Sequence, residues 1–212
     1  MISVLLVDDH AMMREGLKAL LSASAGIRIV AEAGDGRDAI RHAEELSPDV
    51  VIMDLSMPGL NGVEAARLLH EKCPGIRIVM LSMHSSSEYV FRAFQAGATG
   101  YLLKESAGAE VEAAVRAVYA GRRYLSRKLG ALDPAMQTAQ GQASPLESLS
   151  ARERQVLQLV VEGHSSSGIA ELVHLSPKSV ETYRSRLMKK LGVRDIPALV
   201  KFAVEHGLTP PG

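Results

Sequence analysis

Short apolar runs alternate with longer amphipathic stretches up to about residue 120 of the chain. The runs are rich in β-branched residues, which is typical of buried strands, whereas the stretches repeat their apolar positions with helical spacing. We predict strands at Ser3–Val7, Arg28–Ala33, Val50–Met53, Arg77–Leu81 and Gly100–Leu103. We predict helices at Ala11–Ala23, Arg37–Glu45, Gly62–Lys72, Glu88–Gln95 and Ala109–Ala120. This alternation predicts an α/β domain of flavodoxin-like fold, a doubly wound five-stranded parallel sheet with helices on both faces.

The pattern changes after residue 122, and from residue 148 to residue 212 it is helical only. We therefore expect one domain at 1–122 and a small all-α domain at 148–212. Residues 123–147 contain Gly, Pro and many small polar residues, so we predict a linker there, with a short helix allowed at Arg127–Leu132.

The second domain carries clear helix start and stop signals. Ser150 begins a capping box, and Gly163 ends the helix that follows it. Ser176 and Pro177 supply an N-cap and a first-turn proline for the helix predicted at Pro177–Leu191. The other two helices of this domain are predicted at Ser166–Val173 and Ile196–His206.

Composition narrows the classes of protein to which the chain can belong. The formal net charge is zero, so a nucleic-acid partner would require a local basic surface. Cys73 is the only cysteine, which excludes an intrachain disulfide and is typical of a reducing compartment. No apolar run is long enough to span a membrane, and we expect no signal peptide because the strand pattern starts at once. We therefore expect a cytoplasmic protein with no membrane partner.

Polar side chains stand at the ends of four predicted strands. Asp8 and Asp9 follow the first strand, Asp54 the third, Ser82 the fourth and Lys104 the fifth. Such strand ends share one edge of a parallel sheet, where ligands bind. Three carboxylates crowd negative charge unless a cation joins them, and Mg²⁺ suits carboxylate and phosphate oxygens. An ammonium and a hydroxyl can bind phosphoryl oxygens, so the set favours reversible phosphorylation of a carboxylate.

The strand-end residues resemble the motifs of a response-regulator receiver domain, in the correct order over about the first 120 residues. The motifs are Val7-Asp8-Asp9-His10, Asp54-Leu55-Ser56-Met57-Pro58-Gly59-Leu60-Asn61-Gly62, Ser82-Met83-His84 and Gly100-Tyr101-Leu102-Leu103-Lys104. The resemblance implies that Asp54 is the phosphoacceptor and a Mg²⁺ ligand. Asp9 would bind Mg²⁺ directly, Asp8 would act partly through water, and the Ser56 carbonyl would complete the protein ligands.

The resemblance also implies a conformational switch. Ser82 and Tyr101 would be the switch pair, with the hydroxyl moving towards the phosphoryl group and the ring rotating inward. Receivers often have a cis proline after Lys104, whereas Glu105 follows here, so we expect a trans bond. His84 lies beside the path of the attacking water in relatives, and we expect it to tune the lifetime of the phosphoryl group. An unchanged dephosphorylation rate in His84→Ala would exclude that role.

The predicted helix Pro177–Leu191 is amphipathic. Val180, Tyr183, Leu187 and Leu191 recur with helical spacing and should pack inward, while the opposite face is polar and basic. A basic face of this kind usually belongs to an ordinary surface helix that faces solvent and binds no partner. Here a short helix and a tight turn precede it, and helix-turn-helix geometry directs such a face into the major groove of DNA.

The C-terminal segment resembles a LuxR-type helix-turn-helix over nearly all of its length, and the whole chain resembles a NarL/FixJ-type response regulator. The matching residues are Leu149-Ser150-Ala151-Arg152-Glu153, Gly163-His164-Ser165, Ile169-Ala170, Val180-Glu181-Thr182-Tyr183 and Lys190-Leu191-Gly192-Val193. The resemblance implies that the residues facing base edges are Lys178, Glu181, Thr182 and Ser185. The residues that it places near phosphates are Arg184, Arg186 and Lys189. The family usually has an acidic residue or Gln where Gly168 stands, so half of a capping box is missing.

We expect a two-component response regulator that controls transcription and is not an enzyme. A sensor histidine kinase would phosphorylate Asp54, and a homodimer would then bind double-stranded promoter DNA sequence-specifically. An aspartyl-phosphate hydrolase is disfavoured because Ser56 stands where such an enzyme has a second Asp. The residues also allow a receiver that acts without phosphate, and a basic helix that contacts a protein instead of DNA.

Overall fold

The computed structural model describes residues 1–130 and 145–205, except for the side chains at 147, 204 and 205. The chain divides into two compact units, Met1–Thr138 and Ala139–Gly212, and each is described by itself. No helix in the described ranges is long and apolar enough to cross a membrane.

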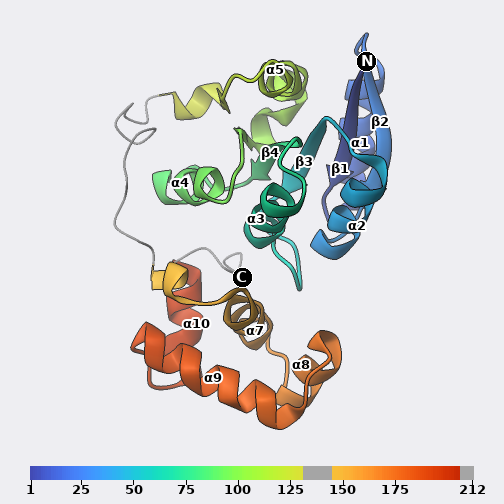
Figure 1. Cartoon of the computed structure of the whole chain (residues 1–212). Coiled ribbons are helices and arrows are strands. Elements are labelled where there is room, and N and C mark those ends of the chain that lie inside the picture. The colour runs from blue at the N-terminus through green and yellow to red at the C-terminus, as the bar shows by residue number, and fades with distance from the viewer. Residues whose placement is uncertain (131–144, 206–212) are drawn as a thin grey trace. The chain divides into compact units, whose positions relative to one another are not determined.

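The first unit is built on a parallel sheet of six strands in the order β2-β1-β3-β4-β5-β6. Figure 1 labels the first four of these strands. The strands are β1 (Ile2–Val7), β2 (Ile27–Ala33), β3 (Val50–Asp54), β4 (Arg77–Ser82), β5 (Gly100–Leu103) and β6 (Tyr124–Leu125). The predicted α/β fold is therefore confirmed, but the prediction of five strands is wrong. A strand of two residues, β6, is too short to show an apolar pattern, and it lies where the linker was expected.

Helices cover both faces of this sheet. They are α1 (Ala11–Ser22), α2 (Gly36–Leu46), α3 (Gly62–Lys72), α4 (Ser87–Gln95) and α5 (Ala107–Tyr119), with single 3₁₀ turns at Lys104–Ser106 and Arg127–Leu129. The first apolar core contains side chains of α2, α3 and α4, and the second contains those of α1 and α5. Neighbouring residues of β1 alternate between these cores, as Leu5 and Val7 join the first and Val4 and Leu6 the second.

Gly62 allows α3 to begin against the end of β3. A Cβ atom at this position would lie 2.0 Å from the Asp54 carbonyl oxygen, which no side chain could tolerate. The Gly62 amide donates to the Leu55 carbonyl at 3.0 Å, and the Asn61 side chain caps the helix by accepting from the Glu64 amide. Glycine at 62 therefore fixes the loop that follows Asp54.

The second unit is helical, as predicted. After a 3₁₀ turn at Pro145–Ser148 come α7 (Ala151–Val161), α8 (Ser166–Val173), α9 (Pro177–Leu191) and α10 (Ile196–Glu205). Ser150 and Glu153 form the predicted capping box of α7. The described part of α10 ends at Glu205, so His206 lies outside the described residues, as do residues 131 and 132 of the short helix allowed at Arg127–Leu132.

Candidate functional site

The carboxyl ends of four strands meet at one edge of the sheet, as the sequence predicts. Lys104 follows β5, and its Nζ lies 2.8 Å from Asp8 Oδ2 and 2.9 Å from Asp54 Oδ2. Asp8 and Asp54 are each 1% exposed, and the Lys104 side chain is 9% exposed. One ammonium therefore lies between two buried carboxylates that are far apart in sequence.

Burial is the main influence on the ionisation of Asp54. It raises the pKa of Asp54 to about 6, and the negative charge of Asp8 acts in the same direction. The nearby Lys104 ammonium and the Ser56 amide, which donates to Asp54 Oδ1 at 3.2 Å, oppose that rise. Burial also disfavours the charged form of Lys104, but its contacts with the two carboxylates outweigh burial and raise its pKa.

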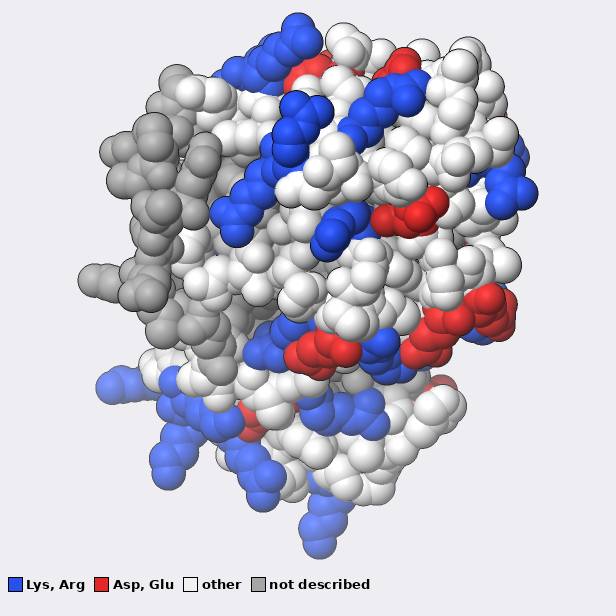
Figure 2. Space-filling model, turned by 45° about the horizontal axis from the view of Figure 1, so that its top comes forward, with Lys and Arg blue, Asp and Glu red and all other residues white. Residues whose placement is uncertain are grey.

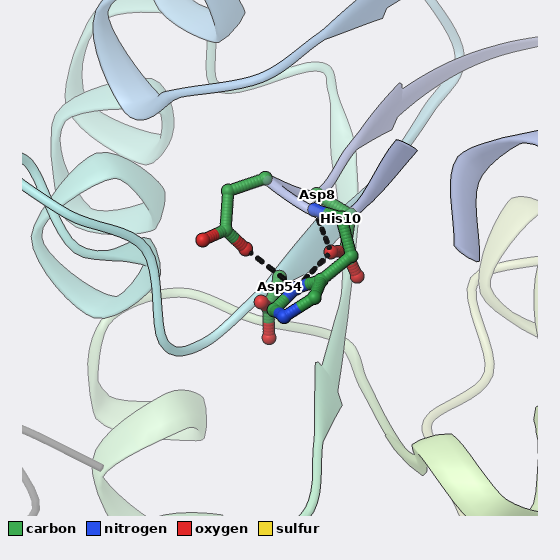
Figure 3. A group of neighbouring side chains, drawn as sticks. Asp8, His10 and Asp54 are labelled. Carbon is green, nitrogen blue, oxygen red and sulfur yellow. Dashed lines mark hydrogen bonds and ion pairs between the residues drawn. The ribbon is translucent and has the colours of Figure 1, made fainter. Parts of the chain in front are cut away.

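The acidic cluster has the donors that a metal ion requires. Ligand atoms of Asp8, Asp9, His10 and Asp54 all lie within 4.8 Å of one another, and Figure 3 shows Asp8, His10 and Asp54 converging. Oδ2 of Asp8 and of Asp54 contact the Lys104 ammonium, yet neither has a hydrogen bond of good geometry among the described residues. Buried carboxylate oxygens without such hydrogen bonds are suitable ligands for a hard divalent cation.

The more exposed members of the cluster lie around its rim. Asp9 is exposed, and its Oδ1 lies 2.8 Å from the Nδ1 atom of His10. The same nitrogen lies 3.1 Å from Asp8 Oδ1. Ser56 is half-buried in the loop after β3. Sequence reasoning missed the contacts of His10, although its place directly after two acids was the available signal.

Ser82 and Tyr101 are linked through the backbone of His84. The Tyr101 ring is fully buried, and its hydroxyl donates to the His84 carbonyl at 2.8 Å. The His84 amide donates to Ser82 Oγ at 3.0 Å. The His84 ring stacks on Tyr89, with 4.0 Å between ring centroids. Burial raises the pKa of Tyr101 and lowers that of His84. The peptide bond between Lys104 and Glu105 is trans, as predicted.

The predicted inward stripe of α9 is confirmed. Val180 and Leu187 are fully buried, while Tyr183 and Leu191 are partly buried against the same core. Lys and Arg side chains project from the C-terminal unit in Figure 2. Of the residues predicted to face DNA, those exposed to solvent are Lys178, Glu181, Thr182, Ser185, Arg186 and Lys189.

Arg184 differs from the other predicted phosphate contacts. Its side chain is 22% exposed, and Nη1 donates to Ser166 Oγ at 2.6 Å and to Glu181 Oε1 at 3.3 Å. The Ser166 hydroxyl also donates to Glu181. Arg184 therefore joins α8 to α9, a contact that amphipathic periodicity does not reveal.

Lys190 also makes contacts inside the second unit. Its Nζ lies 2.7 Å from Glu153 Oε2 and donates to the Ser148 carbonyl at 3.0 Å. Because Glu153 belongs to the capping box of α7, Lys190 fixes the last turn of α9 to the first turn of α7. A lysine that flanks the basic face is thus part of the internal structure.

Comparisons with known proteins agree with both parts of this arrangement. The model of the response regulator receiver domain matches residues 4–116, and that of the bacterial regulatory proteins of the luxR family matches residues 147–203. The chain is 41% identical to the response regulator UvrY of Escherichia coli (strain K12), covering 98% of this chain and 96% of UvrY. It is 40% identical to the response regulator GacA of Pseudomonas aeruginosa, covering 98% of each chain.

A solved structure gives the same result. The crystal structure of a LuxR-family two-component response regulator from Aurantimonas sp. SI85-9A1 is 39% identical, with a TM-score of 0.61. The match covers 65% of this chain and 98% of that one. The chain belongs to the response regulators, with a receiver domain followed by a DNA-binding domain of the luxR family.

Proposed function

We propose that Asp54 is the phosphoacceptor and that a sensor histidine kinase is its phosphodonor. The observation that carries this proposal is the pair of buried carboxylates, Asp8 and Asp54, on either side of the Lys104 ammonium. A carboxylate oxygen of Asp54 attacks phosphorus, the bond from phosphorus to the kinase imidazole breaks, and its electron pair returns to that nitrogen. Lys104 and the Ser82 hydroxyl bind the phosphoryl oxygens on the product.

Mg²⁺ is the metal ion that the acidic cluster would hold. The residues that supply oxygen ligands are Asp8, Asp9 and Asp54, with the carbonyl of Ser56 as a further ligand. When bound, the ion supplies positive charge that offsets the charge of the phosphoryl oxygens. His10 lies at the rim of the cluster, where it holds Asp9 through the contact between Nδ1 and Oδ1.

The switch in this proposal consists of Ser82, Tyr101 and the backbone of His84 between them. A phosphoryl group that draws the Ser82 hydroxyl towards itself competes with the bond from the His84 amide. The His84 carbonyl accepts from Tyr101, so a shift of this loop reaches the Tyr101 ring directly. The stack of His84 on Tyr89 is consistent with a role for His84 in the lifetime of the phosphoryl group.

The output in this proposal is binding of promoter DNA in the cytoplasm by a homodimer that phosphorylation favours. The exposed residues of α9 that would contact base edges are Lys178, Glu181, Thr182 and Ser185. Arg186 and Lys189 would contact phosphates, with Arg184 holding α8 and α9 in the helix-turn-helix geometry. Such binding regulates transcription and requires no enzymatic turnover.

Phosphorylation in vitro tests the proposal. The wild type and Asp54→Asn are treated with acetyl phosphate and Mg²⁺, and intact mass, oligomer size and DNA binding are measured. Asp38→Asn is the matched control. Asp38 belongs to the same unit, is exposed, and forms an ion pair with Arg41. We expect phosphoryl mass on the wild type and on Asp38→Asn but not on Asp54→Asn. Equal incorporation in all three variants would exclude Asp54 as the acceptor.

A further inference from the structure

The carboxylate of Glu110 lies buried between α5 and the segment that leaves the receiver domain. Glu110 is 4% exposed. Its Oε2 accepts from the Tyr124 hydroxyl at 2.9 Å, from Ser126 Oγ at 3.2 Å and from the Arg127 amide at 3.1 Å. All three donors belong to Tyr124–Leu129, which we call the exit segment because it lies between the receiver helices and the C-terminal unit.

The exit segment is also bonded to the strand that carries the switch residue. Leu125 pairs in parallel register with Tyr101, and the Ser126 amide donates to the Tyr101 carbonyl at 2.9 Å. Leu129 is 3% exposed and belongs to the same apolar core as Tyr101. The exit segment is therefore joined to Tyr101 through the backbone and shares its apolar core.

Burial makes the Glu110 contacts strong and specific. Ser126 is fully buried, so its hydroxyl cannot turn to water if the carboxylate is removed. Burial and the hydrogen bond to Glu110 raise the pKa of Tyr124 to about 12. Loss of the carboxylate would leave two hydroxyls and an amide without this acceptor, which costs more than the bonds themselves contribute.

We propose that Glu110 is a positioning residue that couples the phosphorylation site to the DNA-binding domain by holding the exit segment on the Tyr101 strand. This inference rests on the proposed function and deepens it. A movement of Tyr101 is passed along the chain only as far as that chain is fixed to it, because a loose connection absorbs the movement in its own conformational freedom. Among the described residues, the hydrogen bonds of the Glu110 carboxylate go to the exit segment and not to Asp54, Ser82 or Lys104, so its proposed role runs through the exit segment.

The test compares Glu110→Ala with Glu112→Ala. Glu112 stands on the same helix, but its side chain is 50% exposed and its carboxylate pairs with Arg116 on α5. Tyr124→Phe with Ser126→Ala is the second test variant, because it removes two of the donors and keeps the carboxylate. Measured on the full chain are intact mass after acetyl phosphate and Mg²⁺, DNA affinity with and without phosphorylation, and amide hydrogen exchange at residues 124–130.

We expect every variant to gain phosphoryl mass as the wild type does. In Glu110→Ala and in the double variant, the gain of DNA affinity on phosphorylation should fall by about tenfold, which corresponds to about 1.4 kcal/mol of lost coupling. The amides of Ser126, Arg127 and Leu129 should exchange faster, whereas Glu112→Ala should behave as the wild type. If Glu110→Ala does not fold, the double variant decides the outcome.

The full wild-type gain of affinity in a phosphorylated Glu110→Ala protein, or in the double variant, would overturn the coupling role. Unchanged exchange at residues 124–130 would do so as well, because the carboxylate would then not hold the segment. These outcomes differ from failure of the proposed function, in which the wild type itself gains no affinity on phosphorylation and the coupling proposal falls with it.

Discussion

The two units of this protein hold their functional charges in opposite ways. In the receiver domain Asp8, Asp54 and Lys104 are buried against one another, and the pKa values of Asp54 and Lys104 depend on burial and on direct contact. In the C-terminal domain Arg186 and Lys189 extend into solvent. Buried charges interact over short distances with little screening, whereas exposed charges act through salt-dependent attraction. The receiver is thus suited to one small dianion, and the second domain to a long polyanion.

Not every charged side chain of the second domain is directed into solvent. Arg184 and Lys190 stand on α9, yet each makes internal hydrogen bonds within the second unit. The basic character of α9 therefore has two origins, one that stabilises the fold and one that faces outward. Variants can separate these origins and test the contrast between the domains.

The largest expected effect is a change in stability at Asp54. The pKa of Asp54 is about 6 in the folded protein and near 3.8 in an unfolded chain. Between these values the folded form holds a proton that the unfolded form has lost, so the free energy of unfolding falls as pH rises through this window and levels above it. The wild type should lose about 3 kcal/mol of its free energy of unfolding across this window. Asp54→Asn should not show this loss, because its side chain does not ionise.

Urea unfolding in EDTA between about pH 4 and pH 7 measures this effect. The quantity of interest is the stability of Asp54→Asn minus that of the wild type, because other titrating groups cancel in it. We expect the difference to grow in favour of Asn as pH rises, and to stay flat for Asp38→Asn. A difference for Asp54→Asn that does not change with pH would mean that burial does not control this carboxylate.

The next effect is on the salt dependence of DNA binding. Arg186→Ala with Lys189→Ala should lower the slope of log affinity against log salt by about 1.8, since each lost phosphate contact removes about 0.9. A fourfold rise in salt should then weaken the wild type about tenfold more than the variant. Binding curves at two salt concentrations measure this.

Two controls sharpen the salt experiment. Lys72→Ala removes an exposed lysine of the receiver whose partner is Glu44, and it should leave the slope unchanged. Arg184→Ala should lower the melting temperature of the C-terminal domain, because it removes the contact between α8 and α9. Identical slopes for the wild type and the Arg186 and Lys189 variant would place the phosphate contacts elsewhere on the chain.

The smallest effect concerns helix capping in the second domain. Ser150 and Glu153 cap α7 reciprocally, whereas at α8 Ser165 accepts from the Gly168 amide at 3.1 Å and no side chain at 168 returns the bond. A Cβ at 168 would meet only Ser165 Oγ at 3.5 Å, so a larger residue fits. Gly168→Glu should raise stability by about 0.5–1.5 kcal/mol. Thermal unfolding tests this against Gly168→Ala, and a lowered melting temperature for the Glu variant would contradict it.

Local pattern was sufficient to predict most of the fold. The bounds of α3, α8, α9 and β5 were predicted to the residue, because caps, glycines and apolar spacing mark them in the sequence itself. The meeting of Asp8, Asp54 and Lys104 followed from the rule that parallel strands share an edge. Their distances and the resulting pKa of Asp54 depend on burial, which periodicity does not quantify.

The contacts that sequence could not predict join side chains to distant backbone or to distant helices. The Tyr101 hydroxyl reaches the His84 carbonyl, and Glu110 accepts from the exit segment, across loops whose paths no periodic pattern sets. Strand β6 forms because Leu125 lies beside Tyr101 in three dimensions, not because two residues favour a strand. These are contacts set by tertiary structure, and they include the ones through which we propose that Glu110 acts.

The central claim is that a charge change at Asp54 controls DNA binding by the second domain. The most direct measurement is DNA affinity of the wild type and of Asp54→Asn, before and after acetyl phosphate and Mg²⁺, with intact mass recorded on the same samples. We predict that the wild type gains one phosphoryl group and binds DNA more tightly, while Asp54→Asn gains neither. A phosphorylated wild type with unchanged affinity, or an Asp54→Asn protein that responds equally, would contradict the account.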